Sequence, residues 1–222
     1  GELGRLLEAR GAVVVHVPLI EIHEPDDGGA AFRRDLARLD EHDWLVVTSV
    51  PGAQRAGAAA ASTPHVRLAA VGTSTAEVLA DLAGRSVDAV PPVQHADALA
   101  DVLIDRTAGT RARFFLAHAD RAGPTLVDRL TAAGHDVTSS VAYRTVLRRP
   151  DPDVALDADA LLLASGSSAQ AWAEAVGTQT PPVVVAIGPS TAATATKLGL
   201  KISAVATDHS LAGLLAELER CL

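Results

Sequence analysis

The stretch Ala70-Val71-Gly72-Thr73-Ser74-Thr75-Ala76 returns 116 residues later as Ala186-Ile187-Gly188-Pro189-Ser190-Thr191-Ala192. The same displacement maps Ser49 onto Ser165, and a displacement of 115 maps Leu99 onto Leu214. A helical stretch with its following apolar residues, 3–14, returns at displacement 123 as 126–137. Coincidence among Ala-rich segments is the alternative. Because glycines and hydroxyl residues repeat together with the alanines and in a fixed order, the sequence favours a duplicated unit.

Short apolar segments alternate with Ala-rich helical patterns along the whole chain, which predicts an α/β fold. Each apolar segment has the length and composition of a strand that is buried on both faces of a sheet. We therefore predict two similar parallel-sheet domains with helices on both faces. The predicted strands are Ala12–Val15, Trp44–Val47, Leu68–Val71, Phe114–Ala117, Ala160–Leu163 and Val183–Ile187, and two predicted helices are Thr125–Ala133 and Leu211–Leu218.

Two extended segments mark where the chain crosses between the predicted domains. Residues 17–23 and 140–146 follow the repeated helix–strand unit, alternate like half-exposed strands and run into polar, Pro-containing linkers. We expect them to pair as a two-stranded antiparallel ladder that acts as a hinge. This gives a discontinuous first domain, 1–16 plus 150–222, an inserted second domain, 24–140, and linkers at 17–23 and 141–149. We also expect the first domain's initial strand to lie upstream of Gly1.

Composition limits the possible functions. The net charge is −8, basic runs are absent, and the six aromatic residues are too few for a stacking surface, so we expect no nucleic-acid partner. No apolar run reaches the roughly 18 residues that a membrane span needs. The single cysteine, Cys221, excludes an internal disulfide and fits the cytoplasm, and the scattered histidines predict no metal site. We expect a cytoplasmic monomer.

Four loops that each follow a strand and open a helix are the candidate ligand-binding segments. In an open α/β sheet, ligands bind beyond the carboxyl ends of the strands, and helix N-termini with free N–H groups bind anions. Each hydroxyl taken singly is better explained as a helix N-cap, but the duplicated set favours a binding site. The candidate residues are Thr48, Ser49, Gly72, Thr73, Thr75, Ser165, Gly166, Gly188, Pro189, Ser190 and Thr191.

Tyr143 is the only tyrosine, and it falls on the second crossing strand. A phenol at this place could donate a proton to a ligand, and a half-buried aromatic on a strand is an equally good interpretation. Phosphate-binding glycine motifs and a Gly-x-Ser-x-Gly elbow are absent from the sequence. Ser165-Gly166-Ser167 has no His or Asp partner in sequence, so we do not interpret it as a nucleophile.

The order and spacing of these motifs resemble the uroporphyrinogen-III synthase family over nearly the whole chain. The resemblance rests on the segments Thr48-Ser49, Val71-Gly72-x-x-Thr75-Ala76, Ala142-Tyr143-Arg144-Thr145, Leu163-Ala164-Ser165 and Ala186-Ile187-Gly188-Pro189-Ser190-Thr191-Ala192. It implies cyclisation of hydroxymethylbilane to uroporphyrinogen III, with inversion of the last pyrrole ring and loss of water. It also implies no metal or cofactor, Tyr143 as the residue that assists loss of the hydroxyl, and the four loops as the substrate site.

Two other classes of function remain open at this stage. A hinged, non-enzymatic module that binds an anionic ligand or regulates another protein would have the same fold. A glycosyl- or acyl-transferase is less well supported, because no catalytic carboxylate or nucleophile stands out. The resembling family's substrate, a linear tetrapyrrole, carries eight carboxylates, and an acidic protein cannot attract it at long range. Local donors at helix N-termini would have to hold it.

Overall fold

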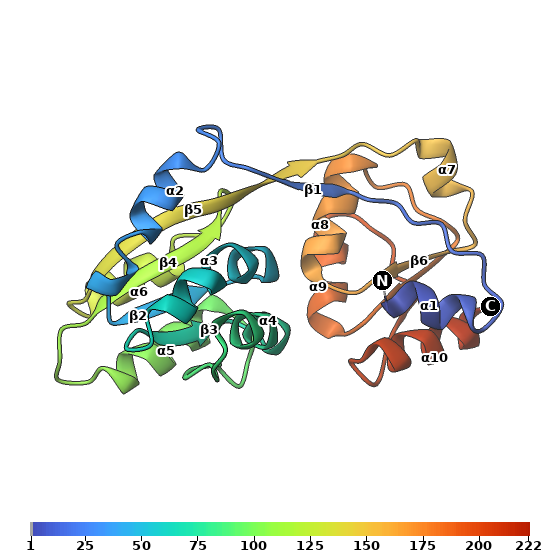
Figure 1. Ribbon diagram of the computed structural model, residues 1–222. Coiled ribbons are helices and arrows are strands. Elements are labelled where there is room, and N and C mark those ends of the chain that lie inside the picture. The colour runs from blue at the N-terminus through green and yellow to red at the C-terminus, as the bar shows by residue number, and fades with distance from the viewer. Residues whose placement is uncertain (1) are drawn as a thin grey trace. The chain divides into compact units, whose positions relative to one another are not determined.

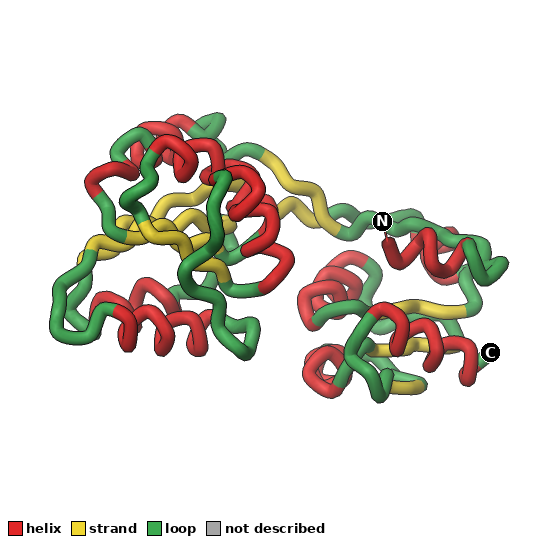
Figure 2. Tube along the Cα trace, turned by 60° about the horizontal axis from the view of Figure 1, so that its bottom comes forward, coloured by secondary structure: helices red, strands yellow, loops and turns green. Residues whose placement is uncertain are grey.

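The computed structural model describes residues 2–222, apart from the side chain of Pro152. Its chain divides into two compact units, each of which is described by itself. Unit 1 contains the residues up to Glu21 together with Val146–Leu222, and unit 2 contains Ile22–Thr145. Helices lie on both sides of the strands in each unit (Figures 1 and 2).

Unit 2 is built on a five-stranded sheet of order β1-β5-β4-β2-β3. The pairs β2–β3, β2–β4 and β4–β5 are parallel, and the register of β4 against β5 shifts between His118 and Ala119. The strands are β1 (Ile20–His23), β2 (Trp44–Val47), β3 (Arg67–Ala70), β4 (Arg113–Ala119) and β5 (Asp136–Leu147). The helices are α2 (Ala30–Leu36), η1 (Leu39–Glu41), α3 (Val50–Ser62), α4 (Thr73–Ala83), α5 (Ala96–Arg106) and α6 (Thr125–Ala132).

Alternate side chains of β2 point to opposite faces of this sheet, as the two-residue period of a strand requires. Leu45 and Val47 belong to the core cluster that α2, α3 and α4 cover. Trp44 and Val46 belong to a second cluster, which α5 and α6 cover. All four side chains are at most 1% exposed. The sheet is therefore buried on both faces, and its carboxyl edge is where loops can reach a ligand.

Unit 1 has a smaller parallel sheet of order β6-β7-β8. Its strands are β6 (Ala160–Leu163), β7 (Val183–Ala186) and β8 (Ala204–Val205), and its helices are α1 (Glu2–Glu8), α7 (Pro152–Leu156), α8 (Gly166–Ala175), α9 (Pro189–Lys197) and α10 (Leu211–Cys221). Trp172 packs with Leu163 and Val184 on one face of the sheet. Leu214 packs with Val185 on the other face. Unit 1 thus repeats the layered arrangement of unit 2.

The duplication predicted from sequence is present in the strand register. Trp44 pairs with Arg67 and Ala160 pairs with Val183, so two partners 23 residues apart recur at a displacement of 116. The helix N-caps follow the same displacement, from Ser49 to Ser165. Identical register together with identical cap positions indicates one α/β unit used twice.

One predicted strand is wrong. Ala12–Val15 belongs to no strand or helix, and Val13 is 94% exposed. A segment becomes a strand only when a neighbour accepts and donates its backbone hydrogen bonds, and none of the strands among residues 2–222 pairs with it. The other predicted strands and both predicted helices are present, with ends that differ by a few residues. Within 17–23 only Ile20–His23 is a strand, whereas β5 is longer than predicted.

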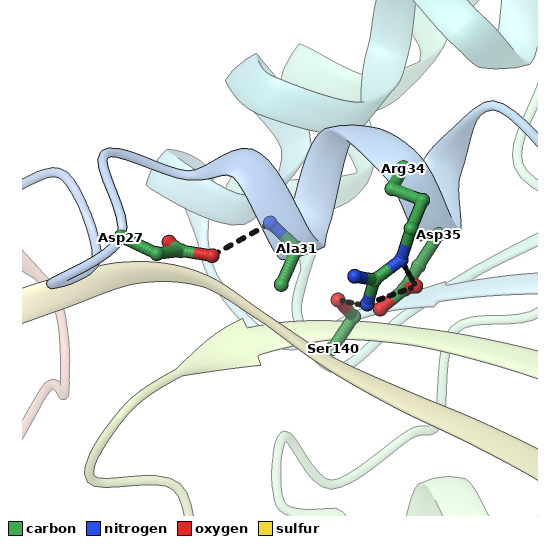
Figure 3. A network of polar contacts seen from close by, with 5 residues as sticks. All are labelled: Asp27, Ala31, Arg34, Asp35 and Ser140. Carbon is green, nitrogen blue, oxygen red and sulfur yellow. Dashed lines mark hydrogen bonds and ion pairs between the residues drawn. The ribbon is translucent and has the colours of Figure 1, made fainter.

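Polar contacts fix helix α2 against strand β5 (Figure 3). The Ser140 hydroxyl donates to Asp35 Oδ2 at 2.9 Å, across 105 residues of sequence, and Arg34 pairs with the same carboxylate at 3.1 Å. Asp27 accepts the N–H of Ala31 at 2.7 Å. Of these contacts, the Ser140–Asp35 bond joins α2 to the sheet, beside the burial of Phe32, and the other two lie within α2 and the residues just before it.

Within residues 2–222, no helix combines the length and the apolar character that crossing a membrane requires.

Candidate ligand site at the strand ends

Two of the four candidate loops begin side by side in unit 2, because their strands are parallel neighbours. Strand β2 leads into Thr48 and Ser49, and strand β3 leads into Val71 and Gly72. The N–H of Val71 donates to the Val47 carbonyl at 3.2 Å, which continues the ladder to the point where the loops start. Thr48 and Ser49 are partly exposed. This edge of the sheet therefore presents both loops to solvent together.

Ser49 is the N-cap of α3, and its Oγ accepts the N–H of Gly52 at 3.3 Å. The turn is tight at Gly52. A Cβ at that position would lie 3.2 Å from both the Ala117 carbonyl oxygen and Ser49 Oγ. Glycine thus lets the first turn of α3 come close to strand β4.

The second loop of unit 2 starts α4 without a side-chain cap, and Gln94 lies against it: a Cβ on Gly72 would lie 2.4 Å from Gln94 Oε1. Gly72 is the N-cap of α4 and provides no side-chain hydrogen bond to the first turn. Thr73 is exposed, and its Oγ1 accepts from Gln94 Nε2 at 3.4 Å. Thr75 lies on the buried face of α4 and is only 7% exposed, so it presents little surface to a ligand. Uncapped N–H groups at a helix N-terminus are available to an anion.

Tyr143 is joined to the first of these loops. Its ring is 6% exposed and packs in the core cluster under α3, and its hydroxyl donates to Ser49 Oγ at 2.8 Å. The Arg55 guanidinium lies 5.5 Å from the centre of the Tyr143 ring, within the range of a cation–π contact. The fold therefore brings together two candidate residues that are 94 positions apart in the sequence.

Unit 1 presents a matching pair of loops. The N–H of Ile187 donates to the Leu163 carbonyl at 3.0 Å, the counterpart of the Val71 bond in unit 2. Ser165 caps α8 in a capping box with Ser168, in which the Ser168 N–H donates to Ser165 Oγ at 3.1 Å. A Cβ on Gly166 would lie 3.1 Å from Thr194 Oγ1 of α9, so α8 and α9 begin close together.

The second loop of unit 1 is glycine-capped, as in unit 2. Gly188 gives α9 no side-chain cap, and Pro189 occupies the first helical turn, where its missing N–H costs nothing. Ser190 is exposed, whereas Thr191 is buried, with 6% exposure. Each unit thus pairs a serine-capped helix with a glycine-capped helix whose N-cap provides no side-chain hydrogen bond.

Sequence reasoning gave no binding role to three residues near these loops. Arg55 lies against Tyr143, Gln94 bonds Thr73, and the His209 ring lies 3.2 Å from where a Gly188 Cβ would be. Arg55 could have been found from the sequence, because it lies on the helix that Ser49 caps. Helical periodicity determines which face of that helix carries its side chain. Gln94 and His209 belong to loops far along the chain, and no pattern marks them.

Shifted pKa values occur away from the candidate loops. Backbone N–H groups of Ala31, and more weakly of Gly29, lower the pKa of Asp27, and the Arg111 guanidinium lowers that of Asp136. The carboxylates in turn raise the arginine pKa values, as at Arg111. Among the described residues, no group of three or more His, Cys, Asp or Glu side chains lies close enough to hold a metal ion. The loops therefore offer neutral hydroxyls and amides for binding.

Comparisons with known proteins agree on one family. The family described as uroporphyrinogen-III synthase HemD matches residues 1–216. A mutant uroporphyrinogen III synthase from Thermus thermophilus has a similar structure, with a TM-score of 0.65 and 20% identity over 99% of this chain and 93% of that one. The structure of uroporphyrinogen-III synthetase from Helicobacter pylori is also similar, with a TM-score of 0.61 and 16% identity over 93% of this chain and 92% of that one. A search of the curated proteins gave no significant match.

The structural likenesses show the α/β fold, and the family match defines the class, which is the lyases of tetrapyrrole biosynthesis. Within that class, the chain belongs to the uroporphyrinogen-III synthase family.

Proposed function

We propose that this protein closes hydroxymethylbilane to uroporphyrinogen III in a site made of the four strand-end loops. The function follows from membership of the family, which matches nearly the whole chain. The observation that supports the site is the matched pair of helix N-termini in each unit. Ser49 and Ser165 cap one helix, and Gly72 and Gly188 open the other. Such loops offer many neutral donors to a ligand with many carboxylates.

The proposed chemistry needs positioning more than strong acids or bases. The bilane closes unaided to the isomer without inversion, so the enzyme has to hold the chain ends in the geometry that lets the inverted ring attack. Binding groups in the proposed site are Thr48, Ser49, Gly72, Thr73, Thr75, Ser165, Gly166, Gly188, Pro189, Ser190 and Thr191, with Tyr143 as the catalytic residue. Buried Thr75 and Thr191 would act mainly by shaping their helices.

We further propose that the two units are the functional domains and that segments 17–23 and 141–149 form the hinge between them. Strand β1 lies next to β5 in the sheet order, and each strand continues from one unit into the other. We also propose that the protein works as a cytoplasmic monomer, without a nucleic-acid partner, which its net charge of −8 and single cysteine support.

Product analysis tests this proposal. Freshly prepared hydroxymethylbilane is supplied to the protein, the porphyrinogens are oxidised, and the ratio of isomer III to isomer I is measured. We expect isomer III to dominate, and a heat-unfolded sample to give isomer I only. Exclusive formation of isomer I at the spontaneous rate by the folded protein would contradict the proposed reaction.

Site variants test the loops. Ser165→Ala is expected to lower the yield of isomer III, because it removes a hydroxyl at a strand end of unit 1. The control is Ser62→Ala, an exposed serine at the last residue of α3, the end of that helix opposite its N-cap Ser49. Equal isomer ratios for the two variants would remove Ser165 from the site.

A further inference from the structure

The Tyr143 hydroxyl donates its hydrogen bond to another residue of the protein, Ser49. The residue lies on β5 just after the irregularity in the β4–β5 register, where Tyr143 pairs with Ala119. The ring is 6% exposed, and the hydroxyl donates to Ser49 Oγ at 2.8 Å. A phenol has one proton to donate. While this bond is present, Tyr143 cannot also donate to a ligand.

Both acceptor positions of the Ser49 hydroxyl are occupied, and its own proton remains available for donation. A serine hydroxyl has two acceptor lone pairs and one donor. Its lone pairs receive the Tyr143 hydroxyl at 2.8 Å and the Gly52 N–H at 3.3 Å. Within residues 2–222, no acceptor for the Ser49 O–H is found. Ser49 is partly exposed, so this O–H is available to a ligand oxygen.

Arg55 contacts the ring of Tyr143, while Ser49 contacts its hydroxyl. Its guanidinium lies 5.5 Å from the centre of the Tyr143 ring, Nη1 donates to the Pro51 carbonyl at 3.3 Å, and Nη2 pairs with Glu24 at 3.2 Å. Helix α3 therefore contacts Tyr143 twice, through its N-cap Ser49 at the hydroxyl and through Arg55 at the ring. The cation–π contact holds the ring in place, so both ends of the Tyr143 side chain are fixed by α3.

We propose that Ser49 is the residue of unit 2 that donates a hydrogen bond to an oxygen of the bilane, and that Tyr143 is a positioning residue that acts through Ser49. This inference rests on the proposed function, and it replaces the catalytic role given to Tyr143 there by a positioning role. The Tyr143 and Gly52 bonds occupy both lone pairs of the Ser49 hydroxyl, which leaves its proton as the group that can bond a ligand. Donation by Tyr143 also strengthens donation by Ser49, since hydrogen bonds in a chain polarise one another.

The first test observes the Tyr143–Ser49 hydrogen bond directly and needs no activity measurement. Tyr143 is the only tyrosine, so the tyrosine Fermi doublet in the Raman spectrum reports the hydrogen bond of this one phenol. We expect a strong-donor ratio in the wild-type protein and a shift towards a weak or absent donor in Ser49→Ala. Ser62→Ala, on the same helix, is the control and should leave the doublet unchanged. A doublet unaffected by Ser49→Ala would overturn the inference.

The second test is a double-mutant cycle on isomer III formation with Ser49→Ala, Tyr143→Phe and the combined variant. Loss of a positioned donor typically slows an enzyme by about 10²–10³-fold, and we expect each single variant to approach the lower part of that range. Because Tyr143 acts through Ser49, Tyr143→Phe should change the rate less than about twofold in the Ser49→Ala background. Equal factors for Tyr143→Phe in both backgrounds would refute the inference.

Two further comparisons sharpen the result. Ser49→Thr keeps the hydroxyl and should recover most of the rate, which a purely structural role of the serine side chain would not require. An effect on kcat assigns the acceptor as the departing hydroxyl of the bilane, and an effect on KM alone assigns it as a carboxylate. Wild-type protein that gives only isomer I would refute the proposed function and the catalytic half of this inference, while the Raman measurement still decides the Ser49–Tyr143 contact.

Discussion

Each unit contains one buried tryptophan, and this makes their stabilities separately measurable. Trp44 of unit 2 is 1% exposed and Trp172 of unit 1 is 2% exposed. Leu99 and Leu214 are equivalent in the two copies, and both are fully buried. Replacing either leucine by alanine should cost its own unit about 2–5 kcal/mol, through lost burial and the cavity left behind.

The assay is urea unfolding followed by tryptophan fluorescence in Trp44→Phe and Trp172→Phe backgrounds, each with its own reference curve. A unit of this size loses roughly 2 kcal/mol of stability per molar urea, so a loss of about 3 kcal/mol in Leu99→Ala should lower the Trp44 midpoint by about 1.5 M. The Trp172 transition should stay in place, and Leu214→Ala should do the reverse. Midpoints that move together for both probes would show one cooperative structure and refute the independence of the two units.

Three other predictions follow from local geometry. Gly213→Ala should destabilise unit 1 by roughly 1–3 kcal/mol in the same unfolding assay, because its Cβ would lie 2.0 Å from the Asp208 carbonyl oxygen, which is backbone and cannot swing away. Ser165→Ala should cost about 1 kcal/mol through loss of the α8 cap, and Ser165→Gly only a few tenths. Backbone N–H bonds lower the pKa of Asp27 in the folded state, so its contribution is present above the unfolded-state pKa and disappears as the pH falls through the folded one. Stability measured against pH should therefore show a smaller difference between wild type and Asp27→Ala in acid, and a constant difference would contradict this account.

The repeated loops were predictable because local chemistry determines them. A short apolar run followed by a small or hydroxyl residue and an Ala-rich stretch specifies strand, turn and helix at both Ser49 and Ser165, whatever surrounds them. The displacement of 116 then predicted that the two copies share one architecture. Trp44 opposite Arg67, and Ala160 opposite Val183, confirm this prediction at the level of register.

Ala12–Val15 shows the opposite case. Its composition is that of a buried strand, but a strand exists only in a sheet, and composition does not reveal whether a partner is in place. Likewise, the burial of Thr75 and Thr191 depends on which side of α4 and α9 faces the core. Sequence identified both threonines as loop residues and could not tell how much of their surface stays exposed.

Sequence by itself determined the α/β class, the duplication, the four hydroxyl- and glycine-bearing loops and the uroporphyrinogen-III synthase family, because all of these depend on residues close together in the chain or on the order of motifs. Only the tertiary structure decided that the Tyr143 proton is donated to Ser49 and that Arg55 lies over the same ring. The reason is that Tyr143 of strand β5 comes 94 residues after Ser49, and the register of β5 against β4 is shifted just before Tyr143. A one-residue difference in that register would point the phenol to the other face of the sheet, away from Ser49.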